Sequence, residues 1–123
     1  MTTRDLPPSW PEVVWPPGTP DWEASAVSWL LEQVPPEYRR YDVLRRYPVL
    51  LARFAADHTA AALEAARKGW RSMRVDLGDH LPAEALDAGM DAYEREGSRL
   101  AAAARSVEVV SAALRGTRWV PRL

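Results

Sequence analysis

The sequence predicts an all-α protein whose C-terminal two-thirds form a long antiparallel helical hairpin. Two stretches that proline does not interrupt, at about 49–77 and 82–115, predict the two helices. Between them, Gly78 suits the end of the first helix and Pro82 suits the first turn of the second. A connection this short favours antiparallel neighbours.

The heptad spacing of the second long helix is the strongest periodicity in the chain. Steps of four and three positions relate Leu86, Met90, Tyr93, Gly97, Leu100, Ala104, Val107, Ser111 and Leu114. The first long helix has a matching series of Ala52, Ala55, Thr59, Ala62, Ala66, Gly69 and Met73. Because many of these residues are small, we expect a tight hairpin whose axes are closer than the usual distance of about 8–10 Å. In that arrangement Ala62, Ala66 and Gly69 face the stretch from Gly97 to Ser111.

Two short helices and a proline-rich arm are expected before the hairpin. Residues 1–20 form the Pro/Trp-rich arm, and residues 21–123 form a single helical domain. The first short helix starts near Asp21, with Thr19 or Asp21 as its cap, and runs to about Gln33. The second runs from about Pro36 to Tyr47. The arm carries Trp10 and Trp15, which we expect to pack over the helices or to dock on another protein.

A second apolar stripe on the first long helix lies beside the seam. The short helices and the arm can cover this stripe only in part, and it consists of Leu51, Phe54, Leu63, Trp70 and Leu77. Pairing with a second copy of the chain would hide this stripe inside a four-helix core. We therefore expect a homodimer, and the candidate interface residues are Leu63, Trp70, Leu77, Trp10 and Trp15.

Composition excludes several classes of function. The formal net charge is −1, so no strong overall field attracts nucleic acid or an anionic membrane. The chain has no cysteine, which excludes disulfides and thiolate metal sites. No secretory signal or membrane-spanning stretch is seen, which favours a cytoplasmic location. A single lysine, Lys68, accompanies fifteen arginines, as is typical of a high-GC genome such as an actinobacterial one.

The segment 38–53 is the nearest approach to a ligand site. It interleaves arginine with tyrosine, a combination that can neutralise phosphates and stack on bases. The candidate residues for an anionic or nucleotide-like ligand are Arg39, Arg40, Arg45, Arg46, Tyr38 and Tyr41. The alternative is an amphipathic helix whose tyrosines face inward while its arginines remain in solvent.

Residues that could support catalysis are sparse. The two histidines, His58 and His80, are too far apart on one helix to share a metal ion. The Asp57–His58 pair is the one cluster that an enzyme could use, and no catalytic or cofactor-binding motif is present. We therefore expect no catalytic site, no metal and no cofactor. The sequence favours a non-enzymatic helical protein that mediates protein–protein interaction, assembly or regulation, with a ligand-binding module as the alternative.

Overall fold

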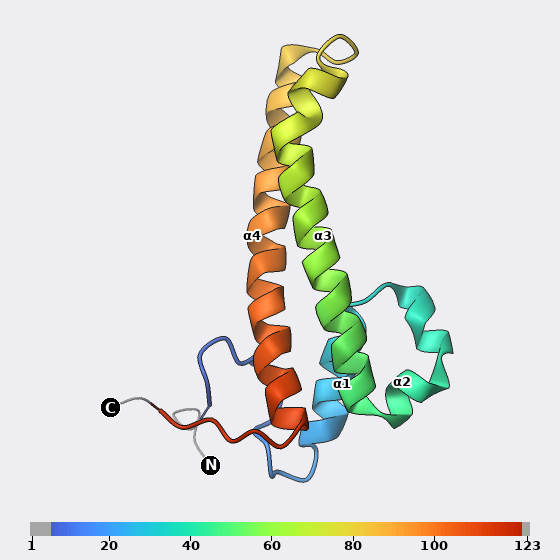
Figure 1. Ribbon diagram of the computed structural model, residues 1–123, viewed down its shortest axis with the longest axis vertical. Coiled ribbons are helices and arrows are strands. Elements are labelled where there is room, and N and C mark those ends of the chain that lie inside the picture. The colour runs from blue at the N-terminus through green and yellow to red at the C-terminus, as the bar shows by residue number, and fades with distance from the viewer. Residues whose placement is uncertain (1–5, 122–123) are drawn as a thin grey trace.

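The computed structural model describes residues 6–121 and is helical, without strands in that range. Two long helices, α3 (Pro48–Leu77) and α4 (Ala83–Leu114), pack side by side as an antiparallel hairpin (Figure 1). Three short elements precede them: α1 (Trp22–Glu32), the 3-10 helix η2 (Pro36–Arg40) and α2 (Asp42–Arg46). The predicted bounds of the hairpin are confirmed to within one residue at each end.

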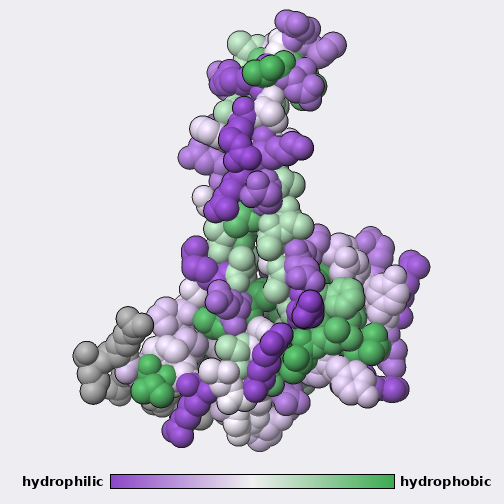
Figure 2. Space-filling model, viewed as in Figure 1, coloured by the Kyte–Doolittle hydropathy of each residue, from purple (hydrophilic) through white to green (hydrophobic). Residues whose placement is uncertain are grey.

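The hydrophobic core is concentrated at the base of the hairpin, away from the α3–α4 turn. There α1 packs on both long helices, and α2 packs on α3 (Figure 1). The buried cluster combines residues from every part of the chain that meets at this base: Val14, Ala26, Leu30, Leu31, Val34, Leu44, Leu51, Ala52, Ala55, Val107 and Val110. The distal hairpin buries much less, since Ala66, Met73, Leu86 and Leu100 are its buried side chains. Figure 2 shows this contrast, with hydrophilic side chains crowding the distal half.

The predicted seam between the long helices is confirmed. Every residue of both heptad series is buried or half-buried. The expected register is wrong at one position, because Gly69 faces the ring of Tyr93 and not the stretch from Gly97 to Ser111. The expectation of tight packing also fails at Gly97, where a Cβ atom would meet no atom within 4 Å. The side chains of Tyr93 and Met73 instead pack against Gly69 and Gly89, so the close contacts in this part of the seam are large on small and not small on small.

The prediction of one continuous second short helix is wrong, because this segment divides into η2 and α2. Tyr41 between them is extended, with φ −88° and ψ 96°. In one continuous helix, Tyr38 and Leu44 would point about 120° apart around the axis. The break re-aims the chain, so that Leu44 is buried while Tyr38 packs against Phe54 at a ring-centroid distance of 5.9 Å.

The described part of the arm, residues 6–20, reaches the core through Trp10 and Val14. Trp10 is half-buried, its Nε1–H donates to the Val14 carbonyl at 2.9 Å, and its ring lies 6.3 Å from that of Trp22. Trp15 differs, since 60% of it is exposed. Asp21 is the residue before α1, but its side chain forms no capping hydrogen bond, while the Thr19 hydroxyl donates to the Pro16 carbonyl.

No helix within residues 6–121 has both the length and the apolar character that crossing a lipid bilayer requires.

Candidate functional site

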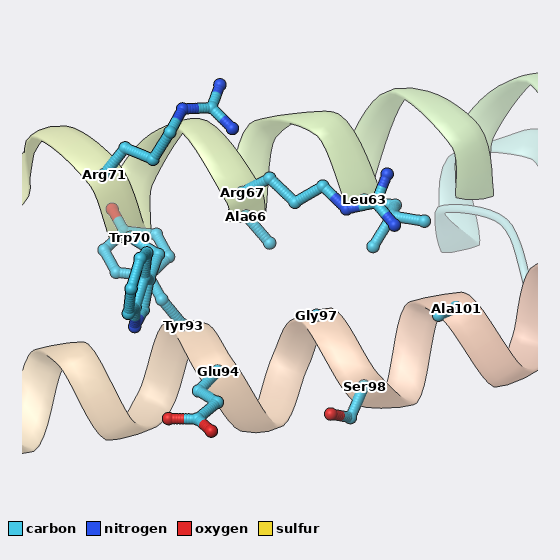
Figure 3. Close-up of a pocket in the computed structure, with 10 residues that line it drawn as sticks. All are labelled: Leu63, Ala66, Arg67, Trp70, Arg71, Tyr93, Glu94, Gly97, Ser98 and Ala101. Carbon is cyan, nitrogen blue, oxygen red and sulfur yellow. The ribbon is translucent and has the colours of Figure 1, made fainter.

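An open groove lies between α3 and α4 beyond the base of the hairpin. It has a volume of about 480 Å³. Its α3 wall carries Leu63, Ala66, Arg67, Trp70 and Arg71, and its α4 wall carries Tyr93, Glu94, Gly97, Ser98 and Ala101 (Figure 3). We call these ten residues the hairpin groove.

The groove exists because large and small residues alternate along the seam. The Tyr93 ring occupies the space where a side chain of residue 69 would stand, and so it fills the seam at one end. Further along, Ala66, Gly97 and Ala101 have too little side-chain volume to fill the space between the helices. Figure 3 shows Trp70 and Tyr93 at one end of the gap and Leu63 at the other.

The hairpin groove is the uncovered side of the hairpin. Another side of the hairpin faces the end of α1, where Glu32 and Gln33 line a smaller cavity of about 150 Å³ together with His58 and Arg99. Ser98 lines the hairpin groove, whereas Arg99, which points about 100° further around α4, lines this smaller cavity. None of the residues that line the hairpin groove comes from α1, η2, α2 or the described arm. Trp70 is consequently 47% exposed.

Charged side chains border the hairpin groove. Arg67 and Arg71 stand on the α3 wall, and Glu94 stands on the α4 wall. Arg71 lies 3.7 Å from Glu64 of its own helix, whereas neither Arg67 nor Glu94 has an ion-pair partner within residues 6–121. Nearer the turn, a salt bridge of 2.5 Å joins Arg74 to Asp87.

The candidate interface residues of the sequence occupy three different places. Leu63 and Trp70 line the hairpin groove together. Leu77 is exposed at the end of α3, outside the groove lining. Trp10 packs against the base core, and Trp15 is exposed on the arm.

The candidate ligand residues are grouped on η2 and α2. Arg39, Arg40, Arg45 and Arg46 are all exposed, and Arg46 lies 3.3 Å from Asp42. Tyr38 is half-buried, with its ring edge-on to Phe54 and 6.5 Å from the ring of His58. Tyr41 is exposed and lies edge-on to Tyr38 at 6.2 Å. The four arginines and Tyr41 are therefore each accessible to solvent, while Tyr38 packs η2 on α3.

The acidic and histidine residues form no metal-binding group within residues 6–121. His58 is half-buried beside Tyr38, and Asp57 next to it is exposed. On the α1 side of the hairpin, the Arg99 guanidinium donates to Glu96, with a distance of 3.0 Å from Nε to Oε2. This hydrogen bond lowers the pKa of the Glu96 carboxyl and raises the pKa of Arg99.

The sequence did not indicate that Arg67, Glu94 and Ser98 belong to one site. Glu94 is one of several acids that avoid the heptad seam, a position typical of a solvated face. The one available signal was the pair of Leu63 and Trp70 beside a run of small seam residues.

Comparison of the chain with protein families, with curated proteins and with solved structures finds no match in any of the three.

Proposed function

We propose that this protein is a non-enzymatic helical interaction or assembly protein that works as a homodimer through the hairpin groove. The observation that carries this proposal is the uncovered groove with the exposed indole of Trp70 at its edge. Large aromatic side chains in such positions contribute much of the binding energy when a partner removes them from water.

The distribution of the core supports the same proposal. A pair of helices buries one stripe per helix, and here the distal pair lacks the support that α1 gives to the base. A second hairpin on the open side would complete a four-helix core and bury Leu63 and Trp70. Such an arrangement uses the groove along the part of the hairpin that no other element covers.

The test is the molar mass in solution, measured by light scattering across a range of protein concentrations. We expect the wild-type protein to be a dimer, and we expect Leu63→Glu to give a folded monomer because it places a charge in the apolar interface. Trp70→Ala should raise the dimer dissociation constant by about tenfold or more, as loss of a buried aromatic anchor does.

Val75→Ala is the matched control, since Val75 is an apolar α3 residue that is 91% exposed and outside the groove. It should leave the dissociation constant unchanged. A wild-type protein that stays monomeric at every concentration would refute the homodimer.

A second proposal is a binding module for a small anionic or nucleotide-like ligand on η2 and α2. It is supported by Tyr41, which is exposed next to Arg39 and Arg40 and could stack on a base while the arginines neutralise phosphate. ATP at millimolar concentration should then raise the melting temperature, and Tyr41→Ala should abolish the rise. No change in the wild-type melting temperature would count against this binding site.

A further inference from the structure

The two walls of the hairpin groove are chemically complementary to each other. The α3 wall presents large apolar side chains, Leu63 and Trp70, together with the cations of Arg67 and Arg71. The α4 wall presents small residues, Gly97 and Ala101, together with the carboxylate of Glu94. A surface of this kind is matched by another copy of itself, provided that the α3 wall of one copy meets the α4 wall of the other.

Three contacts define which residues of the two helices stand at the same height. Gly69 lies opposite Tyr93, Gly89 lies opposite Met73, and Arg74 pairs with Asp87. Moving up α3 by a few residues therefore corresponds to moving down α4 by the same number. By this register Arg67 and Glu94 stand at nearly the same height, one on each wall.

We infer that the occupant of the hairpin groove is a second copy of this chain whose α3–α4 turn points in the same direction. The two-fold axis then runs along the groove, and α3 of each copy lies over α4 of the other. Arg67 of one copy pairs with Glu94 of the partner subunit, and by symmetry the pair forms twice. This inference rests on the proposed homodimer, to which it adds the orientation and the residues that select it.

Shape supports this orientation as charge does. Leu63 stands near the height of Ser98 and Ala101, so it can enter the space over these small residues on the other copy. The alternative two-fold arrangement turns the second hairpin end for end and places α3 over α3. With its two-fold axis at the middle of the groove, near the height of Arg67, that arrangement would bring Arg67 against the partner subunit's Arg67. Like charges at a partly desolvated contact disfavour association.

The first experiment exchanges the two charges. Arg67→Glu alone and Glu94→Arg alone should each raise the dimer dissociation constant by about tenfold or more, because each replaces two attractive contacts with two repulsive ones. The double variant carrying both substitutions should dimerise as the wild type does. Lys68→Glu is the matched control, since it makes the same charge change on the neighbouring, exposed residue outside the groove, and it should leave dimerisation unchanged.

Mixing the two single variants gives the sharper outcome. One variant then has glutamate at both positions and the other has arginine at both, so the two attractive pairs form only between unlike chains. We expect a heterodimer at concentrations at which each variant alone is monomeric. A wild-type dimer that none of these substitutions affects would overturn the orientation while leaving the homodimer intact, whereas a monomeric wild type would remove both proposals.

A distance measurement tests the orientation without altering the groove. The chain has no cysteine, so Asp79→Cys in the α3–α4 turn accepts a single nitroxide label. Asp79 follows Ala66 of the groove by thirteen residues, which corresponds to a rise of about 20 Å along the direction of α3. If both turns point the same way, pulsed electron paramagnetic resonance should give a distance between the two nitroxides that corresponds to a backbone separation below about 20 Å. A distance that corresponds to a backbone separation of about 40 Å would show the end-for-end dimer and overturn the inference.

Discussion

The ring of Tyr93 lies against the backbone of Gly69, in the space that a side chain on residue 69 would fill. A Cβ atom built on Gly69 would lie 2.8 Å from Cδ1 of that ring and nearer still to other ring atoms. A second seam glycine, Gly97, has open space at the same place. Both glycines belong to the heptad seam, but they have opposite surroundings.

We expect opposite effects from the two glycine-to-alanine substitutions. Gly69→Ala should lower the free energy of unfolding by about 1 kcal/mol or more, because the gain in helix propensity is smaller than the cost of displacing Tyr93. Gly97→Ala should raise it by about 0.5–1 kcal/mol, since the alanine meets no neighbour. Urea denaturation at low protein concentration measures both values. Equal effects of the two substitutions would show that the Tyr93 ring does not occupy the space beside Gly69.

The arm should contribute to folding through Val14. This residue is 3% exposed, whereas its neighbour Val13 is 68% exposed. Val14→Ala should therefore cost about 2 kcal/mol of unfolding free energy, through lost burial and the cavity that remains. Val13→Ala should change it by less than about 0.5 kcal/mol. If thermal denaturation gave the same small change for both, residues 6–20 would not be part of the folded core.

Leu44 should anchor η2 and α2 to the hairpin. It is buried against the base core, and the adjacent Val43 is exposed on the same short helix. Leu44→Ala should lower the free energy of unfolding by about 2–4 kcal/mol, and it should increase amide hydrogen exchange in residues 36–46. Val43→Ala is the control and should leave both quantities unchanged. If the amides of residues 36–46 stayed protected from exchange in Leu44→Ala, the contact between Tyr38 and Phe54 would be enough to hold this segment on α3.

The methyl group of Thr59 should matter more for stability than its hydroxyl. Thr59 is buried, and its Oγ1–H donates to the carbonyl of Ala55 at 2.9 Å within the same helix. Because helix carbonyls also accept main-chain hydrogen bonds, Thr59→Val leaves no buried donor unpaired and should cost less than about 1 kcal/mol. Thr59→Ser keeps the hydroxyl but opens a small cavity, so it should be the less stable variant. The reverse order in calorimetry would show that the hydroxyl dominates.

Helix bounds and the seam could be predicted from the sequence because their causes are local. Gly78 and Pro82 mark the turn whatever the rest of the chain does, and the heptad spacing selects one face of each helix. The break at Tyr41 could not be predicted in this way. It depends on where α3 presents Phe54 to Tyr38 and where the core receives Leu44, which are contacts between segments distant from each other in space until the chain folds.

The hairpin groove separates most clearly what the sequence determines from what the tertiary structure decides. The amino-acid order establishes that Ala66, Gly69, Tyr93 and Gly97 belong to the inner seam, since the helical period alone places them there. Their axial pairing is decided in three dimensions, where the large ring of Tyr93 must find the one opposing residue that lacks a side chain. That pairing sets the axial register of the two helices and brings Arg67 level with Glu94. Periodicity carries no information about such an offset, because every register that keeps the seam inward buries the same faces.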